Sequence, residues 1–178
     1  MKKYELTSEF VTNAFGRKLF RIKAIVSFGN VKGGQLGGFI ENENNLSHNG
    51  DAWVFGDAQV FGDAQVFGNA WVSGDAQVFG DAQVFGNAQV SGNARVFGDA
   101  DYAVVKGFGR FFRATTFFRC KDKILRVQCG CFYGDFTQFR EIVKKTHGDS
   151  KYAKEYLAIA DLMELHFSDE EEKQEVSE

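Results

Sequence analysis

Residues 51–98 read DAWVFG DAQVFG DAQVFG NAWVSG DAQVFG DAQVFG NAQVSG NARVFG, which is one six-residue unit of the form (D/N)-A-x-V-(F/S)-G repeated eight times without a break. A strict short period of this kind is typical of a solenoid, in which each coil stacks on the previous one, and not of a globular enzyme. Residues two apart in an extended chain share a face, so we expect the alanine and valine of each unit to point inward. The glycine and the following Asp or Asn suit a corner, because glycine readily takes a positive φ and the other two tolerate it.

A longer period lies on top of the six-residue unit. Residues 51–68 and 69–86 are identical at sixteen of eighteen positions, and Trp53 and Trp71 are eighteen residues apart. Three units per coil predict a three-sided prism whose interior holds three valines and three alanines per coil. Further rings would overfill that interior, so we expect the phenylalanines to point outward near the corners.

An aliphatic residue followed four positions later by a small one, as in Val54 and Ala58, resembles the pattern of hexapeptide-repeat proteins with a left-handed parallel β-helix. The resemblance implies a mainly β fold with a short left-handed parallel β-helix. Eight units make fewer than three coils, which is near the lower limit for a stable stack. We therefore expect the flanking segments to cap both ends, as an N-terminal β cap and a C-terminal α+β unit.

Four segments are expected along the chain. They are an N-terminal β cap with a degenerate first coil (1–50), the hexapeptide-repeat β-helix (51–100), an α+β unit (101–167) and an acidic disordered tail (168–178). In the first segment, residues 18–26 alternate in part and predict a strand that pairs antiparallel with residues 3–6. Ile40 and Leu46 fall in phase with the alanine column. The tail carries one basic and six acidic groups, which favours solvation over packing.

The strands expected in residues 101–167 follow the point where the repeat ends. The six-residue period fails after Ala100, and residues 101–105 are predicted to form a strand. Residues 111–119 and 124–131 are predicted to form a β-hairpin that turns near residues 121–123.

Two helices are expected to complete this segment. Asp135 with Gln138 three residues later resembles a capping box, which predicts a helix from residue 136 to about 147 that Gly148 ends. Ser150 can cap a second helix that runs to Phe167.

Outward aromatic columns are candidate binding surfaces. With eighteen residues per coil, Phe61, Phe79 and Phe97 align in one column, and Trp53 and Trp71 align in another on a glutamine-rich face. Tryptophan is enriched at interaction hot spots, and contiguous exposed apolar surfaces mark binding sites. Two alternatives stay open for both columns: a surface that binds a partner or forms an oligomer, or rings that stack on one another beneath the terminal segments.

The corners also carry an acidic column. Asp63, Asp81 and Asp99 are eighteen residues apart from one another. We interpret them as solvated turn carboxylates, although such a column could attract a cation.

Arg110, Arg113 and Arg119 are candidate binding residues in the C-terminal segment. They belong to residues 110–126, RFFRATTFFRCKDKILR, in which phenylalanine is interleaved with Arg and Lys. Aromatic and basic residues together on a sheet are one way to hold single-stranded nucleic acid. Because no nucleic-acid-binding motif accompanies them, a solvated hairpin face is the favoured interpretation.

Composition gives no sign of a cofactor, a metal site or a catalytic residue. The formal net charge is −3, the first ten residues (MKKYELTSEF) contain no apolar run, and no stretch of eighteen apolar residues occurs. We therefore expect no secretory signal and no membrane partner. Cys120, Cys129 and Cys131 suit a reducing cytoplasm and lack the spacing of a zinc site.

The layout of the whole chain is similar to a narrower group of proteins. A YELT-type start, the segment FGNVKGGQLGGFIENENNLS, a GDAxVFGNA array and a basic α+β end resemble small proteins encoded in phages and prophages of Gram-positive bacteria, often labelled polymer-forming or hexapeptide-repeat proteins. The resemblance implies a cytoplasmic accessory protein. The leading hypothesis is a non-catalytic protein-interaction module that binds a host factor through the outward aromatic columns, the basic C-terminal unit or both.

Two alternative functions remain. Many hexapeptide-repeat proteins are trimeric acyltransferases that use a histidine as general base, and His48 is the only residue here that could take that role. The second alternative is a self-assembling structural protein, which would make a homo-oligomer the partner.

Overall fold

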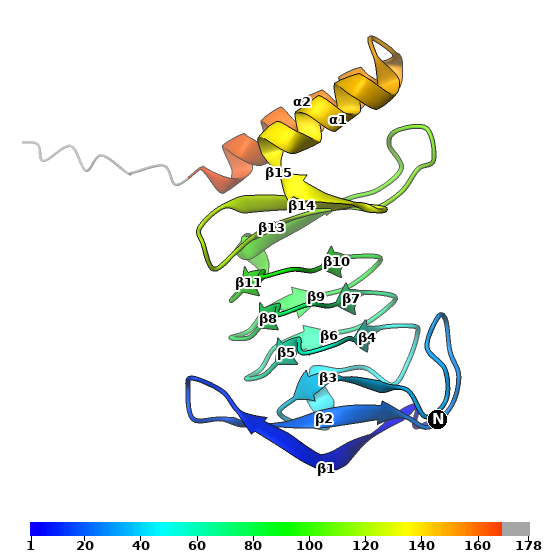
Figure 1. Cartoon of the computed structure of the whole chain (residues 1–178), viewed down its shortest axis with the longest axis vertical. Helices are drawn as coiled ribbons and strands as arrows, with labels where there is room; N and C mark the ends of the chain where they lie inside the picture. Colours follow the sequence, from blue (N-terminus) through cyan, green and yellow to red (C-terminus); the bar gives the residue numbers. More distant parts are fainter. Residues whose placement is uncertain (169–178) are drawn as a thin grey trace, which may run out of the picture.

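Eight two-residue strands, one for each repeat unit, wind into a solenoid of about three coils in the middle of the molecule (Figure 1). The computed structural model describes residues 1–168, so the acidic tail expected at 168–178 lies, but for its first residue, outside the described residues. The eight strands are β4 (Trp53–Val54), β5 (Gln59–Val60), β6 (Gln65–Val66), β7 (Trp71–Val72), β8 (Gln77–Val78), β9 (Gln83–Val84), β10 (Gln89–Val90) and β11 (Arg95–Val96).

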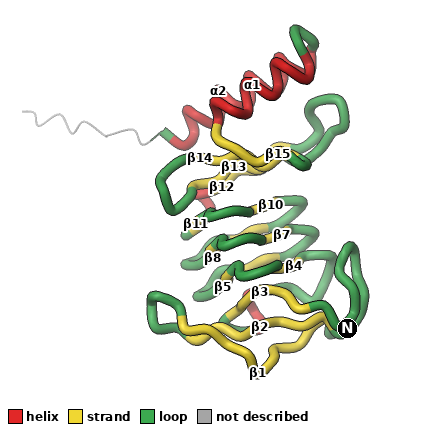
Figure 2. Tube along the Cα trace, in the orientation of Figure 1, coloured by secondary structure: helices red, strands yellow, loops and turns green. Residues whose placement is uncertain are grey.

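Successive coils pair at an interval of eighteen residues, as the sequence predicts. Trp53 lies opposite Trp71, and Trp71 lies opposite Gln89, in the parallel ladder β4–β7–β10. A second ladder runs through β5, β8 and β11 (Figure 2). A third joins β6 and β9 (Figure 1). The prediction of a β-solenoid with three units per coil is confirmed, whereas its left-handed twist stays a prediction.

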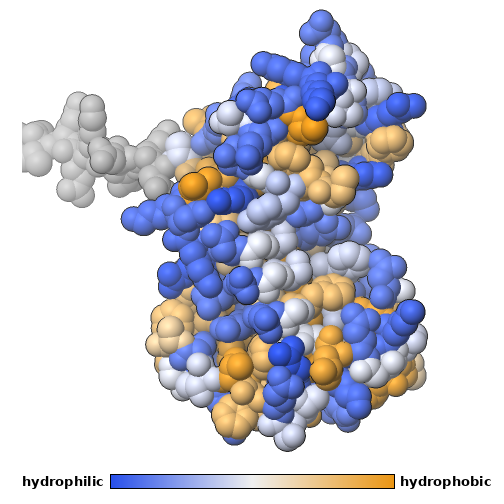
Figure 3. Space-filling model, in the orientation of Figure 1, coloured by the Kyte–Doolittle hydropathy of each residue, from blue (hydrophilic) through white to orange (hydrophobic). Residues whose placement is uncertain are grey.

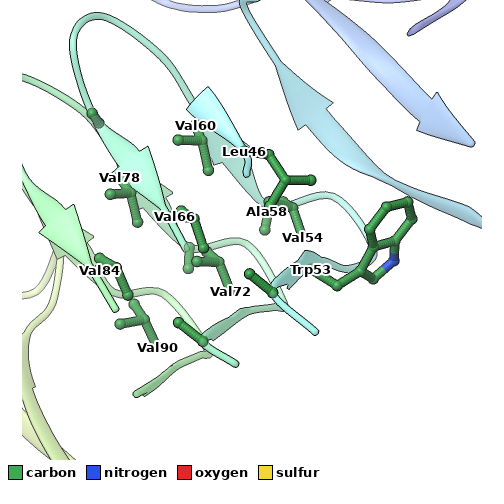
Figure 4. Close-up of a cluster of buried hydrophobic side chains, with 14 of the residues drawn as sticks. Leu46, Trp53, Val54, Ala58, Val60, Val66, Val72, Val78, Val84 and Val90 are labelled. Atoms are coloured by element: carbon green, nitrogen blue, oxygen red, sulfur yellow. The ribbon is translucent and has the colours of Figure 1, made fainter. Parts of the chain in front are cut away.

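Valine and alanine fill the interior of the coils. Every repeat alanine from Ala52 to Ala94 and every repeat valine from Val54 to Val96 is fully buried. Figure 4 shows the valines of successive strands directed into the same interior. The repeat phenylalanines are absent from the fully buried members of this core, so the prediction that they point outward is confirmed. At one corner, Gly74 has a φ of 69°, and a Cβ there would lie 2.9 Å from the carbonyl oxygen of Gly92 in the next coil. Both the backbone conformation and the closeness of the coils therefore require glycine.

An antiparallel sheet of three strands forms the N-terminal cap. Strand β1 (Tyr4–Thr12) pairs with β2 (Lys18–Ala24), and β2 pairs with β3 (Leu36–Ile40). Strand β3 then pairs parallel with β5, so the cap continues directly into the first coil. The expected β cap and its antiparallel pairing are confirmed.

The register expected for the first coil is wrong by two residues. Ile40 lies opposite Val60 and Leu46 opposite Val66, so both occupy the valine column and not the alanine column. Val54 lies eight positions after Leu46, whereas neighbouring valines of the array are six positions apart. The two additional residues belong to the irregular stretch 47–50, which follows the short 3-10 helix at Glu43–Asn45.

The C-terminal unit is a four-stranded antiparallel sheet followed by two helices. Its elements are β12 (Tyr102–Val105), β13 (Thr115–Arg119), β14 (Leu125–Cys129), β15 (Phe132–Asp135), α1 (Phe136–His147) and α2 (Lys151–Phe167), with a 3-10 helix at Asp99–Asp101 before them. The predicted hairpin, both helices and the capping box of Asp135 and Gln138 are confirmed. Strand β15 was not expected. Residues 111–114 were predicted as strand but lie in a loop, where Phe112 has a φ of 52° that no strand accommodates.

The sheet of the C-terminal unit lies between the last coil and the helices (Figure 1). Neighbouring strand residues point to opposite faces. Accordingly, Phe118 is buried in the core of the solenoid, whereas Phe117 packs against Phe136 and Phe139 of α1. One strand thus seals the solenoid and also builds the second core.

Side chains satisfy the backbone at the N-terminal end of the solenoid. The Lys3 ammonium donates to the carbonyl oxygens of Gly50 and Ala52, at 3.1 and 2.8 Å. The Tyr4 hydroxyl donates to the carbonyl oxygen of Leu46 at 2.7 Å. No further coil lies below these carbonyl oxygens to donate hydrogen bonds to them. Leaving buried backbone groups unpaired lowers the free energy of unfolding.

The C-terminal end is closed in a complementary way. The backbone amide of Gln83 donates to the Asp99 carboxylate at 2.8 Å, and that of Gln89 donates to the Thr116 hydroxyl at 3.0 Å. The amide of Phe97 donates to Asp101 at 2.8 Å. Side-chain oxygens here take the place of a further coil, which makes end-to-end stacking of solenoids unfavourable.

None of the helices within residues 1–168 is long and apolar enough to cross a membrane.

Val78→Asp tests the assignment of inside and outside. Val78 is fully buried in the lumen, and the substitution places a carboxylate there without a partner. We expect a loss of at least about 4 kcal/mol in the free energy of unfolding, measured by urea denaturation. The neighbouring Gln77→Glu, which points outward, should cost less than about 0.5 kcal/mol. Equal losses for the two variants would contradict the assignment.

Lys3 makes stability depend on pH. Burial lowers the pKa of Lys3 from 10.5 to about 8, and the nearby charge of Asp51 partly offsets this effect. Between pH 8 and 10.5 the folded protein therefore loses the Lys3 proton while the unfolded chain keeps it. Because the unfolded state then binds more protons, the stability of the wild type should rise with pH relative to Lys3→Met. Denaturation of both proteins across this range measures the difference, and parallel curves would refute the shift.

Candidate functional site

One of the predicted aromatic columns forms a stack along a corner of the solenoid. The rings of Phe61 and Phe79 are stacked, with centroids 5.0 Å apart and planes 10° apart. Phe97 meets Phe79 edge to face, with a centroid distance of 5.3 Å. These geometries follow from the eighteen-residue coil, because equivalent residues of successive coils lie one above another. Such ring pairs contribute roughly 0.5–1.5 kcal/mol beyond the area they bury.

A ring from the N-terminal cap covers the lower part of this column. The ring centroid of Phe15, in the turn between β1 and β2, lies 5.7 Å from the ring centroids of both Phe61 and Phe79. Leu19 and Phe39 of the cap complete the same cluster. As a result Phe61 and Phe79 are buried, whereas Phe97 is 60% exposed and Phe15 is 54% exposed.

The four rings line a groove of about 420 Å³, which we call the aromatic groove: Phe15, Phe61, Phe79 and Phe97, with Arg17, Asp63 and Asp81 among its polar residues. Arg17 is held by Glu41 at 2.9 Å. Asp63 and Asp81 are exposed and make no ion pair with any residue of the described chain, 1–168. The groove therefore combines apolar walls with two uncompensated carboxylates.

The solenoid face built by β6 and β9 adjoins this groove, and we call it the open face. Its outward residues Gln65 and Gln83 are exposed. At its other edge Phe85 stacks on Phe67, with centroids 5.2 Å apart, and stays 50% exposed. Ala103 follows where a third ring of this column would stand.

A hollow marks the end of that second column. It measures about 520 Å³ and lies between Phe85, Tyr102, Ala103 and Lys106. The Tyr102 hydroxyl donates to the carbonyl oxygen of Gln83 and so closes the coil beside the hollow. The open face is thus bordered by an apolar cavity on each side.

The tryptophan column is not a continuous exposed surface. Trp53 is fully buried beneath the N-terminal cap, where Tyr4 and Phe28 meet its ring edge to face at 6.0 and 5.4 Å. Trp71 is half-buried against Phe55, at 5.4 Å. For Trp53 the structure supports the alternative of a ring packed under a terminal segment.

The three predicted arginines divide into two groups. Arg119 is half-buried, donates to the carbonyl oxygen of Phe167 at 3.1 Å and approaches Asp101 at 3.4 Å, so it ties the sheet to the end of α2. Arg110 and Arg113 are exposed in the connection between β12 and β13.

We call this connection, residues 106–113, the basic loop. Its cations are Lys106, Arg110 and Arg113. Its rings are Phe108, Phe111 and Phe112, which are 42%, 62% and 65% exposed.

Sequence reasoning missed Phe15 and the rings of the basic loop. Phe15 lies outside the repeat, in the turn between β1 and β2, where Asn13 and Gly16 indicate a reversal of the chain but not what the turn covers. Phe111 and Phe112 were assigned to a strand, in which one of the two would be buried. The acidic column was noticed, but its place beside an aromatic groove depends on where the cap folds back.

The residues considered for catalysis or metal binding lie in different surroundings. His48 stacks on Tyr4, with centroids 4.3 Å apart, and its Nδ1 accepts from the amide of Lys3 at 3.4 Å. Cys129 is half-buried towards the helices, whereas Cys131 is exposed in a turn. Among residues 1–168 no three His, Cys, Asp or Glu side chains are grouped so that they could hold a metal ion.

Comparison with known protein families gives a match to the array. A family model described as the YdcK beta-solenoid repeat matches residues 58–74, 64–80 and 88–100. All three stretches lie in the array, which is therefore similar to these repeats in sequence as well as in fold. A comparison with curated proteins gives no match.

Phe15→Ser tests whether the cap shields the aromatic column. Despite its 54% exposure, Phe15 contacts two rings, and we expect the substitution to lower the free energy of unfolding by about 1 kcal/mol. Phe112→Ser is the matched control, because Phe112 is 65% exposed and stacks on no ring within residues 1–168. Its cost should stay within about 0.5 kcal/mol in the same thermal melts. A Phe15→Ser variant as stable as the wild type would show that the contact is not a stabilising one.

Proposed function

We propose that the protein is a non-catalytic binding module whose open face, with the aromatic groove at its edge, binds a protein partner. The observation that carries this proposal is the exposure of Phe97 at the end of a column whose other rings are buried. A ring of this kind loses a large apolar area from water when a partner covers it.

The shape and chemistry of the surface support this proposal. The rigid ladder of β6 and β9 offers exposed amides at Gln65 and Gln83, and aromatic side chains border it on both sides. Buried aromatic anchors surrounded by polar groups are typical of interaction hot spots. Cavities of 300–1,000 Å³ are also the usual size of sites that receive a side chain or a small ligand.

An acyltransferase is less well supported. His48, the one candidate base, is engaged in the N-terminal cap by Tyr4 and the Lys3 amide. A general base must reach the proton that it abstracts, and this one is held in a packed cluster.

The resemblance of the chain's layout to phage and prophage proteins supports a partner in a host cell. On this proposal the protein works in the host cytoplasm, and its partner is a host protein. Nucleic acid is a weaker candidate ligand, because Arg119 is engaged within the fold by a hydrogen bond to Phe167 and an ion pair with Asp101.

Site-specific photocrosslinking tests the proposal. A photoreactive phenylalanine analogue at position 97 should form an adduct with a defined protein in a lysate of the source cell. Position 10 is the matched control, since Phe10 is 49% exposed but lies in β1 of the cap. The same adduct should not form there.

The protein found in the adduct is then purified and its affinity measured by calorimetry. Phe97→Ser should weaken binding at least about tenfold, because truncation of a hot-spot ring costs about 2 kcal/mol or more and about 1.4 kcal/mol corresponds to a factor of ten. Phe10→Ser should leave the affinity unchanged. Identical adducts at both positions, or no effect of Phe97→Ser on the affinity, would refute the proposed function.

A further inference from the structure

We propose that a second copy of this chain is a partner of the open face: the basic loop of one copy inserts into the aromatic groove of the next. This inference rests on the proposed function and names one occupant of the same site. It follows from two surfaces of opposite charge that each present rings to solvent.

The basic loop carries charges that the fold does not use. Arg110 and Arg113 place their guanidinium groups over the ring of Phe111, at 5.5 and 5.0 Å from its centroid. Neither arginine, nor Lys106, makes an ion pair with a carboxylate among the residues described. The loop therefore presents cations and rings together.

The fold holds this loop outward. The amide of Gly109 donates to the Glu155 carboxylate at 2.9 Å, and Gly109 is buried beneath the Tyr156 ring. Phe112 takes a φ of 52°, which is rare for a bulky residue and which persists only where the surroundings impose it. Figure 1 shows the connection from β12 to β13 extending beyond the end of the sheet.

The aromatic groove supplies the complementary groups. Its carboxylates Asp63 and Asp81 make no ion pair within residues 1–168, and the exposed ring of Phe97 lines the groove with them. Of the two cations nearby, Arg17 is paired with Glu41, and the guanidinium of Arg95 lies over the Phe79 ring, 5.3 Å from its centroid. A phenylalanine of the loop can pack between the walls while an arginine pairs with a carboxylate. Aromatic pairs and charge-assisted hydrogen bonds would then act at one contact.

The two surfaces cannot meet within one chain. The groove includes the turn between β1 and β2, and Figure 1 shows that turn and the basic loop on opposite sides of the molecule, near opposite ends. Contact therefore requires two copies. Because the loop and the groove lie on opposite sides of each copy, two copies cannot exchange both contacts at once. The interface is therefore heterologous, and assembly continues past a dimer unless a ring closes.

Lateral association also agrees with the closed ends of the solenoid. The backbone groups at which another solenoid could stack are hydrogen-bonded to side chains of this chain, namely Lys3, Tyr4, Asp99 and Thr116. The side surfaces are left for contacts between copies.

Charge reversal on each surface tests the inference with the full chain. One variant carries Arg110→Glu and Arg113→Glu in the loop, and the other carries Asp63→Lys and Asp81→Lys in the groove. Sedimentation velocity at low salt should show the average mass of the wild type rising above the 19.9 kDa of one chain as concentration increases from micromolar to millimolar. About 1 M NaCl should reduce this association, because it shortens the Debye length to about 3 Å.

Each variant alone should remain monomeric, since its loop and groove carry the same sign of charge. An equimolar mixture should associate again, because the reversed loop of one variant matches the reversed groove of the other. All four substituted residues are exposed, and thermal melts verify that each variant is folded.

A wild type that stays monomeric at every concentration overturns the inference, as does a mixture that fails to recover association. Anionic vesicles and a single-stranded oligonucleotide are added as separate probes. Either one binding the loop of a monomeric wild type assigns the loop to that ligand and also overturns the inference. The proposed function stands or falls separately: a crosslink from position 97 to a different protein supports it even when the wild type is monomeric.

Discussion

The narrow lumen of the solenoid is the constraint on which the rest of the structure depends. Eighteen residues close one circuit, and the alanine and valine side chains that point inward leave no exposed surface and no room for a ring. The bulky residue of each unit must therefore stand outside, near a corner. Because neighbouring coils lie about 4.8 Å apart, outside rings at equivalent positions stack on one another. The stack of Phe61 on Phe79 and that of Phe67 on Phe85 are consequences of this spacing.

In a solenoid of only three coils, every coil lies at one of the two ends or next to one. Parallel ladders leave backbone groups unpaired at both ends, and this protein pairs them with side chains from outside the array, such as Lys3 at one end and Asp99 at the other. The flanking segments are thus part of the solenoid and not separate attachments. They also decide which aromatic rings are covered: the cap buries Trp53 and Phe61, and its turn brings Phe15 onto the column, whereas Phe97 and Phe85 are left to solvent.

Exposed aromatic surfaces arise here where the flanking segments leave the regular array uncovered. Two columns repeat a phenylalanine in successive coils, yet in each of them only the last ring, Phe97 or Phe85, is widely exposed. The same asymmetry applies to charge. Residues 51–100 carry one basic and six acidic groups, and residues 101–167 carry twelve basic and eight acidic groups. An acidic, ring-lined groove and a basic, ring-bearing loop therefore lie in different parts of one rigid molecule, where neither can neutralise the other.

The sequence alone determined the features that depend on period and on local capping. The coil length, the inward valines and alanines, the outward phenylalanines and the helix that begins after Asp135 all follow from spacing and from residues close together in the chain. The tertiary structure decided the features that depend on contacts between residues far apart in the chain. The shift of Ile40 into the valine column depends on how two additional residues are accommodated at a corner. The burial of Trp53 depends on Tyr4 and Phe28 of the cap, which lie 49 and 25 residues before it in the chain. Whether an outward ring is a surface or a core residue is settled by what folds over it, and no local pattern records that.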